Sequence, residues 1–429
     1  MSMHSMLTFW GVLVIANIPF VLLQSARDCV ISVPLKSLSH EPFLMLPSVY
    51  SSASSSMMVT SSTPEWLYPQ TRRGGDSNLM IVMKNRESLI ANCIGLKNEL
   101  VLTEASSGTL KCDNGQLELD DWEVSWEDCS CGRRSKSHIR RGSTSCGGTE
   151  FPQAKIHTIG WTLANDVFVP QISVCFDPVR ETTLYTVHRI MGDSLSSKVT
   201  DSKRPDFASS SVFKSPVSEL YTRSAQQQSI ENRFGIPVSS ARGSQFLARG
   251  HLAPDADFSL LAEQDATYYF SNVLPQWQAV NNGNWKQLEE AVRSLASSKK
   301  GRRLVVYTGA LPQPLMLKDK KGVLREVLLD TNNQKIPVPA VLWKAVYDPR
   351  MKKATVVLQL NSVRRDEYQN LLISELSAAA ENHCSELPWV DWNITDYSEG
   401  YTFCWRAEDF VKLLSYAPEG VDTFDLLTA

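Results

Sequence analysis

The sequence predicts an α+β fold in two parts, a small disulfide-stapled β-rich domain followed by a larger domain of mixed strands and helices. Seven of the nine cysteines lie before residue 176, among short apolar runs and loops rich in Gly and Ser. From residue 155 onward, strand-like runs are interspersed with helical patterns. The chain has 429 residues, enough for two hydrophobic cores.

The first 26 residues predict a signal peptide. An apolar run extends from Leu7 to Leu23 and is followed by the small residues Ser25 and Ala26, as at a cleavage site. An uncleaved membrane anchor is the alternative, but the run is short and interrupted by Asn17 and Pro19. We therefore expect a secreted, extracellular protein without stable membrane association.

Residues 29–150 form the predicted cysteine-rich domain, in which the runs 79–83 and 100–102 are typical of short strands. The serine-rich segment 48–63 predicts a flexible loop. The doublet Cys129-Ser130-Cys131 is too tight for a zinc pair, so the cysteines indicate disulfides in an oxidising compartment. Because the count is odd, one thiol is left over or bonds to another chain.

The late loop of the chain carries two further expectations. Cys384 and Cys404 flank a segment rich in Trp and Asp, and we expect them to form a disulfide. Asn393 begins the single Asn-X-Thr sequon of the chain and is the predicted glycosylation site.

Residues 155–429 form the predicted second domain. Its apolar, β-branched runs predict strands at 184–188, 246–252, 268–274, 304–308 and 354–360, the third of them ended by Pro275. Residues 365–381 predict a long helix. A second amphipathic helix is predicted to begin at Asn281.

That helix has one polar edge. Asn281, Trp285, Glu289 and Arg293 recur every four residues and share one stripe of its surface. The edge can serve as an ordinary solvated surface, with Asn281 as the N-cap and an i,i+4 pair between Glu289 and Arg293. It can also hold a metal ion and a phosphate.

His251 directly follows two residues that favour the second interpretation. A single histidine is most often structural. Here Arg249 and Gly250 precede it on a predicted strand that leads toward the polar helix edge. An imidazole in such a position is a candidate general base.

The combined motif resembles the DNA/RNA non-specific endonuclease family, which belongs to the ββα-metal nucleases and includes endonuclease G. The resemblance rests on Arg-Gly-His at 249–251, Ala-Pro-Asp at 253–255, Asn272, Pro-Gln at 275–276, Asn281, Trp285 and Leu-Glu at 288–289. The segment Ala-Arg-Gly-His-Leu-Ala-Pro-Asp at 248–255 most resembles a secreted arthropod branch of digestive and double-stranded-RNA-degrading nucleases. The likeness covers roughly residues 155 to 425, and Ala248 stands where many members have Asp.

The resemblance implies a ββα-metal nuclease domain with a mixed or antiparallel sheet, and a role for each matching residue. His251 would take a proton from the attacking water. Asn281 would be the sole direct protein ligand of Mg²⁺, with Mn²⁺ as a possible substitute. Glu289 would accept hydrogen bonds from the waters around the ion, and Arg249 and Arg293 would neutralise charge in the transition state.

Three weaker matches complete the implied site. They are polar residues assigned to substrate binding: Asn272, Gln276 and Arg204. Arg204 is matched least securely, because the loop that follows it differs in length from that of the family.

Charge adds little to this picture. The formal net charge of −3 gives no overall attraction to nucleic acid, so positive potential would have to be local. Basic runs at 133–141 and 299–303 can contact a substrate backbone or be ordinary solvated loops. Phosphate contacts of this kind confer no sequence specificity.

The sequence thus predicts a secreted, Mg²⁺-dependent, sugar-non-specific endonuclease that cleaves single- or double-stranded DNA and RNA to 5′-phosphate ends, with double-stranded RNA as a favoured substrate. One alternative is a catalytically inactive nucleic-acid-binding protein on a nuclease scaffold. Another is an N-terminal adhesion or carbohydrate-binding module that carries a nuclease.

Overall fold

The computed structural model describes residues 27–33, 40–47, 71–73, 79–163, 165–192, 204–238, 245–297, 302–418, 421 and 425–428. The predicted signal peptide and the serine-rich segment 48–63 lie outside these residues. Within these ranges, no helix has the length and apolarity needed to span a membrane.

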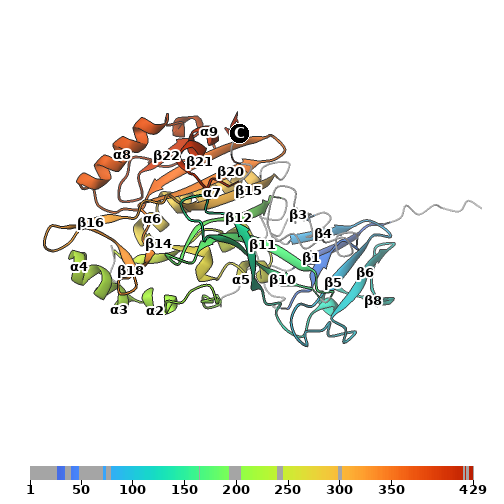
Figure 1. Cartoon of the computed structure of the whole chain (residues 1–429). Helices are drawn as coiled ribbons and strands as arrows, with labels where there is room; N and C mark the ends of the chain where they lie inside the picture. The colour runs from blue at the N-terminus through green and yellow to red at the C-terminus, as the bar shows by residue number, and fades with distance from the viewer. Residues whose placement is uncertain are drawn as a thin grey trace, which may run out of the picture.

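A nine-stranded sheet forms the centre of the molecule (Figure 1). Its order is β22-β21-β20-β15-β12-β11-β10-β9, and β23 pairs with β21. The strands are β9 (His138–Ser145), β10 (Lys155–Thr162), β11 (Phe168–Asp177), β12 (Thr182–Met191), β15 (Arg303–Ala310), β20 (Val341–Asp348), β21 (Lys353–Leu360), β22 (Thr402–Trp405) and β23 (Asp425–Leu426). All neighbours are antiparallel except β23, which runs parallel to β21.

Both faces of this sheet are covered, so its strands are apolar without strict alternation. In β20, Trp343 and Ala345 point into one core, which also contains Phe410 of α9 (Ala407–Leu413) and Leu372 of α8 (Glu367–Ala379). Leu342 and Val346 point into the opposite core, which is shared with α7 (Asn284–Ala296). The predictions of strands at 184–188, 304–308 and 354–360 and of a helix at 365–381 are confirmed.

A separate hairpin leads into α7. It pairs β13 (Leu247–His251) with β14 (Val273–Trp277), and α6 (Gln278–Asn282) follows directly. The strand predicted at 268–274 is wrong in its bounds, because residues 270–272 form a 3₁₀ turn and the strand continues through Pro275. A two-stranded hairpin has only edge strands, in which a proline is tolerated.

Short elements surround the hairpin. They are α2 (Val217–Leu220), α3 (Arg223–Gln226), a π-helical turn (Gln227–Glu231), α4 (Asn232–Phe234), α5 (Leu261–Asp265) and the two-stranded pairs β16 (Met316–Lys318) with β17 (Leu324–Glu326) and β18 (Leu328–Asp330) with β19 (Lys335–Pro337). Residues of α2, the π-helical turn, α4, β16, β18 and β19 share a core with β13 and β14 that includes Phe270, Trp277 and Ile230.

The N-terminal region is built from two small sheets. One is β1 (Cys29–Val33), β4 (Leu79–Met83) and β3 (Thr71–Arg73), in the order β1-β4-β3, and the other is β2 (Phe43–Met45), β5 (Ser88–Asn92), β6 (Ser107–Asp113), β7 (Gln116–Leu119) and β8 (Trp122–Val124) in chain order. The predicted strand at 79–83 is confirmed. The one predicted at 100–102 is wrong, since Leu100 makes only an isolated bridge to Cys131 before a turn.

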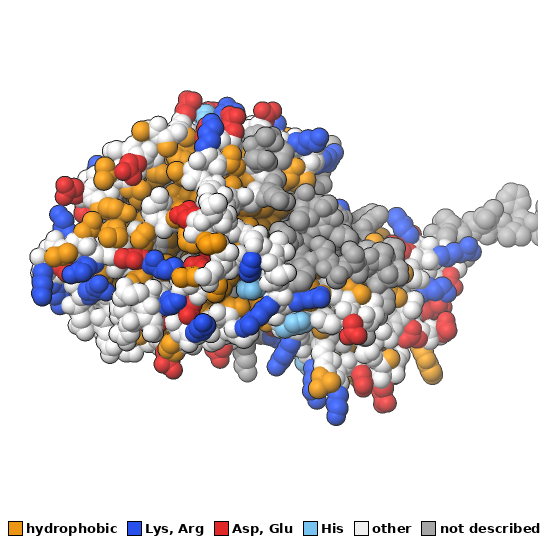
Figure 2. All heavy atoms as spheres, viewed as in Figure 1, with side chains coloured by type: hydrophobic (Ala, Val, Ile, Leu, Met, Phe, Trp, Pro, Cys, Tyr) orange, Lys and Arg blue, Asp and Glu red, His pale blue; other side chains and the backbone are white. Residues whose placement is uncertain are grey.

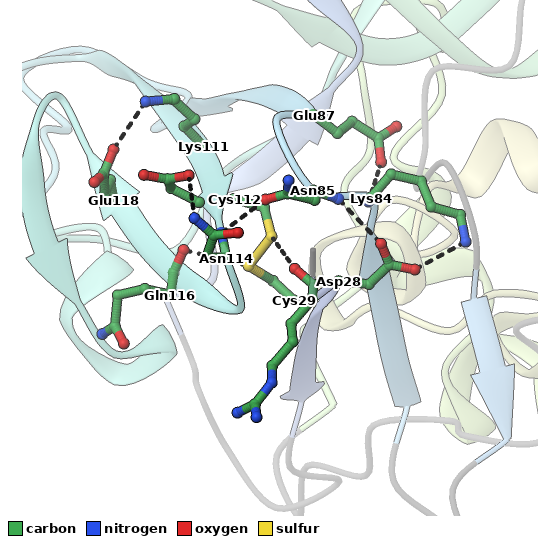
Figure 3. The surroundings of a disulfide bond; sticks show 12 residues. Asp28, Cys29, Lys84, Asn85, Glu87, Lys111, Cys112, Asn114, Gln116 and Glu118 are labelled. Atoms are coloured by element: carbon green, nitrogen blue, oxygen red, sulfur yellow. Dashed lines mark hydrogen bonds and ion pairs between the residues drawn. A yellow bond between two sulfur atoms is a disulfide. The ribbon is translucent and has the colours of Figure 1, made fainter. Parts of the chain in front are cut away.

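Four disulfides staple the chain. Cys29–Cys112 joins the two N-terminal sheets (Figure 3) and Cys93–Cys131 lies in the same region. The predicted pair Cys384–Cys404 is confirmed. The leftover thiol is Cys129, which is buried.

The two regions meet without a clear gap. Strand β9 belongs to the large sheet and Cys146–Cys175 ties the following segment to β11, so a boundary near residue 137 fits the sheet better than one at 150. Phe43 and Ile94 of the N-terminal region pack with Trp161 of β10 in one core. The sheet of β2 and β5–β8 therefore packs directly against β10, the neighbour of edge strand β9 in the large sheet.

Candidate active site

Strand β13 presents Arg249 and His251, two residues apart and thus on one face of the hairpin. Gly250, between them, faces Gln276 of β14, and a Cβ atom at Gly250 would collide with that glutamine side chain. Glycine is needed here because the two strands approach closely.

His251 is half-buried in an aromatic surround. Its ring centroid lies 5.2 Å from that of Phe207 and 5.3 Å from that of Tyr268. Tyr268 Oη donates to Asp255 Oδ2 over 3.0 Å, and the Arg204 guanidinium lies 3.9 Å from the same oxygen. These contacts place the predicted base beside Arg204, whose side chain is 74% exposed.

Arg249 is exposed, and aromatic rings hold its guanidinium. The guanidinium carbon lies 5.3 Å from the ring centroid of Phe207, 5.7 Å from that of Tyr221 and 5.4 Å from that of Phe270. Within the described part of the chain no carboxylate lies at ion-pair distance from it. Stacking thus orients this cation while its charge remains available to an anion.

Asn281 is half-buried in the last turn of α6. The helix predicted to begin at Asn281 is therefore two helices, and the break falls at Gly283, before α7 begins at Asn284. The glycine is required because a Cβ atom there would collide with the backbone of Glu399. Asn281 is the next-to-last residue of the short helix and is not the N-cap of the long one, which is Gly283.

Helix α7 carries Glu289 and Arg293 over a buried cluster of charged groups. Arg293 Nη1 lies 3.1 Å from Asp257 Oδ1, and Asp257 Oδ2 lies 2.8 Å from Nε2 of His188. Burial, together with the negative charge of Asp257, raises the pKa of Glu289 to about 7, although the cation of Lys344 acts in the opposite direction. The expected solvated pair between Glu289 and Arg293 is replaced by a partly buried network.

Lys344 is the cation at the centre of this network. Its Nζ donates to Thr308 Oγ1 over 2.7 Å and to the carbonyl oxygen of Leu252, next to His251, over 3.4 Å. It also lies 5.1 Å from the ring centroid of Trp285. Burial lowers the pKa of Lys344, and the carboxylates of Glu289 and Asp257 raise it. One side chain thus connects the strand of the base with the helix of Glu289.

Sequence reasoning missed Lys344, Asp257 and His188. A signal was present, because Lys344 interrupts the apolar run of β20 and His188 lies in the mostly buried strand β12. Charged residues are almost never fully buried unless they are paired, so such interruptions indicate a buried polar partner.

Two residues predicted to contact the substrate, Asn272 and Gln276, are buried. Asn272 is fully buried, and its amide makes three hydrogen bonds to the backbone of Ala253 and Thr267 at 2.8 to 3.0 Å. Gln276 is 1% exposed and lies behind Gly250. Because neither side chain reaches the surface, we interpret both as structural residues. They support the hairpin and the loop after His251.

The two basic runs differ in position. In the first run, Arg134 pairs with Asp265 at 2.9 Å and Arg141 donates to the carbonyl of Ser211. In the second, residues 299–301 lie outside the described residues and Arg302 lies 4.0 Å from Asp348. Figure 2 shows Lys and Arg side chains in a broken band across the face that carries α4, β14, α5 and β10 in Figure 1.

The side-chain oxygen atoms of Asn281 and Glu289 are of the kind that binds a hard, strongly hydrated cation. Among the described residues no group of three or more His, Cys, Asp or Glu side chains is arranged to hold a metal ion. A site with one amide ligand is of a different type, in which the ion keeps most of its waters. Asn281 on α6 offers such an amide oxygen, and Glu289 on α7 offers a carboxylate eight residues further along the chain.

Comparison with known proteins agrees with this geometry. The family model for DNA/RNA non-specific endonucleases matches residues 153–410. A salivary endonuclease of Lutzomyia longipalpis is 31% identical over 66% of this chain and 66% of its own length. Salivary protein Tsal1 of Glossina morsitans morsitans is 25% identical over 80% and 83%, and human mitochondrial endonuclease G is 36% identical over 22% and 32%. The chain belongs to the DNA/RNA non-specific endonuclease family.

Proposed function

We propose that this protein is an active, metal-dependent endonuclease that hydrolyses phosphodiester bonds of DNA and RNA. The observation that carries the proposal is the direct connection of the hairpin bearing Arg249 and His251 to the helices bearing Asn281, Glu289 and Arg293. The family match and the nuclease relatives support it.

In this proposal His251 is the general base. Phe207 and Tyr268 contact its ring and limit its rotation, so that one nitrogen is directed toward the attacking water. Arg249 and Arg293 bind the phosphate and neutralise the charge that develops on its oxygens. Each guanidinium is oriented before substrate binds, the first by aromatic rings and the second by Asp257.

Asn281 would hold a divalent ion, Mg²⁺ in our proposal and Mn²⁺ as a substitute, which when bound supplies positive charge for the phosphate and the leaving oxygen. Glu289 would accept hydrogen bonds at the edge of that site. Lys344 lies behind Glu289 and favours its carboxylate form.

The substrate expectations follow from contacts to the backbone of the nucleic acid. Phosphate contacts bind without sequence preference, so we propose single- and double-stranded DNA and RNA as substrates, with double-stranded RNA favoured and 5′-phosphate ends as products. Four disulfides, together with relatives named for saliva, support secretion. Asn393 is exposed, as glycosylation of its sequon requires.

The second candidate is a nucleic-acid-binding protein without catalysis. A scaffold that had lost activity would be expected to lack at least one of His251, Asn281, Glu289 and Arg249, and all four are present. This observation favours the enzyme.

A digestion panel tests the proposal. The purified mature chain is incubated with single- and double-stranded DNA and RNA, with Mg²⁺ or EDTA, and the product ends are mapped. We expect cleavage of all four substrates in Mg²⁺, none in EDTA and 5′-phosphate products. Tight binding without cleavage in any metal would support the second candidate, and unchanged cleavage in EDTA would contradict the metal site.

A further inference from the structure

Arg223 lies beside the candidate site but outside every motif that led to it. It is the first residue of α3, two residues after Tyr221, one of the rings against which Arg249 stacks. Its guanidinium stacks on Phe246, the residue just before β13. Two arginines are therefore held by neighbouring aromatic rings along the strand that ends in His251.

The two guanidinium groups act on each other electrostatically. Burial and the positive charge of Arg249 both lower the pKa of Arg223. In the part of the chain that the structure describes, neither arginine forms a salt bridge to an Asp or Glu. Like charges placed close together without a counterion are unfavourable, and an anion bound between them relieves that repulsion.

We propose that Arg223 binds the phosphate group of the nucleotide adjacent to the scissile bond, next to Arg249, which binds the scissile phosphate. This inference rests on the proposed function and extends it from one phosphate to two. A guanidinium that is always charged and presents several N–H donors in one plane is suited to phosphate oxygens. Because Phe246 and Tyr221 fix the two cations in advance, little conformational entropy is lost when the phosphate binds.

A consequence is that the enzyme recognises nucleic acid as a polymer. A substrate with a single internal phosphodiester fills the catalytic position only, whereas a second phosphate also contacts Arg223. One charge-assisted hydrogen-bonding contact corresponds to about a tenfold difference in kcat/KM or more. The contact is made to the backbone and is therefore the same for every base sequence.

The first test is kinetic and uses small substrates. Thymidylyl-thymidine is compared with the same dinucleotide carrying an additional 5′-phosphate or 3′-phosphate, in the native enzyme, Arg223→Ala and Arg223→Lys. For one of the two phosphates we expect a native kcat/KM at least about tenfold above that of the plain dinucleotide. That ratio should fall toward one in Arg223→Ala and lie between the two in Arg223→Lys.

Arg233→Ala is the matched control, because Arg233 lies on α4 of the same helical segment and stacks on its own neighbour Phe234. It removes the same charge, and the native ratio should persist in it. Ratios for both phosphates that are equal in Arg223→Ala and Arg233→Ala would overturn the proposal.

The second test measures binding and does not depend on turnover. Duplex affinity is measured against salt concentration in the His251→Ala background, with and without Arg223→Ala. Loss of one phosphate contact should reduce the slope of log K against log salt by about 0.9. An unchanged slope would contradict the subsite even if the enzyme cleaves. If Arg223→Ala reduces the slope but the native protein cleaves no nucleic acid, the phosphate subsite stands and the proposed nuclease function is rejected.

Discussion

The N-terminal region and the nuclease region bury different kinds of side chains. In the described residues before 138, the fully buried polar side chains are Asn92, Asn98 and Ser135, all uncharged, and two disulfides cross the core. Glu41 is only partly buried, and its carboxyl group lies at the contact with the nuclease region. The nuclease region buries Asp257 and Lys344 with other ionisable groups, and these two lie beneath α7, the helix that carries Glu289 and Arg293.

This difference separates two ways of holding a fold. A small region that cannot build a large core is stabilised by cross-links and needs no desolvated charge. The larger region contains buried ion pairs. Such pairs contribute little net stability, but removing one partner strongly destabilises the fold because the other charge stays buried and unpaired. The expected role of those ions is therefore to fix the geometry of Glu289, Arg293 and His251.

The largest effect is expected from Asn281→Ala, which removes the proposed metal ligand without touching the buried network. Loss of the ion would remove several kcal/mol of transition-state stabilisation, so cleavage should fall by about 10³-fold or more at a Mg²⁺ concentration that saturates the native enzyme. Cleavage rates over a Mg²⁺ titration measure this. Unchanged metal dependence would contradict direct ligation by Asn281.

Lys344→Met tests whether the buried network differs from an ordinary core. Removal of the cation leaves Glu289 and Asp257 less compensated, so the free energy of unfolding should fall by about 3–5 kcal/mol. Urea denaturation of the nuclease region measures the change. Val346→Ala is a control on the same strand and creates only a cavity. A variant as stable as the native protein would show that Lys344 is not needed to balance those carboxylates.

Replacing both Cys93 and Cys131 by Ser tests how far the N-terminal region depends on its disulfides. The bond closes a loop of 38 residues, and its loss should destabilise the N-terminal region by about 2–4 kcal/mol. Hydrogen exchange, followed by region, should show the change before residue 138 and leave the strands β20 and β21 protected. Equal loss of protection in both regions would mean that they unfold as one unit.

The smallest effect concerns a carboxylate at the contact between the regions. Burial, and then the nearby Glu263 carboxylate, raise the pKa of Glu41 to about 8. Because the folded form binds its proton more tightly than the unfolded form, stability is full below about pH 4.5 and decreases as the pH rises toward 8. Glu41→Gln should therefore remove most of this decrease.

Chemical denaturation at pH 5, 6.5 and 8 measures the Glu41 effect. Glu118→Gln is a suitable control, since Glu118 is paired with Lys111 within the N-terminal region. Parallel pH profiles for the native protein and Glu41→Gln would contradict the role of Glu41.

The sequence predicted the parts of the fold that depend on local patterns. Apolar β-branched runs located three strands of the large sheet, β12, β15 and β21, and the motif around His251 identified the family before any geometry was known. The predicted strand at 268–274 was wrong because Pro275 was read as a strand end, although an edge strand accepts it. The break at Gly283 was missed because its cause, the backbone of Glu399, lies more than a hundred residues away.

The same distinction applies to the site. His251 and Arg249 could be predicted as site residues because they lie in one short sequence motif. Lys344 contacts Leu252 only because the fold brings β20 close to the hairpin. Arg223 joins the site through stacking on Phe246, a contact that no spacing rule predicts. Residues brought together by long-range packing need the structure.

The most direct test of the central claim is the cleavage rate of His251→Ala on a long duplex at saturating Mg²⁺, measured beside its duplex affinity. The account predicts a loss of cleavage of about 10²- to 10⁴-fold with affinity almost unchanged, because the imidazole moves a proton and does not hold the substrate. Cleavage at the native rate would contradict the assignment of His251 as the general base.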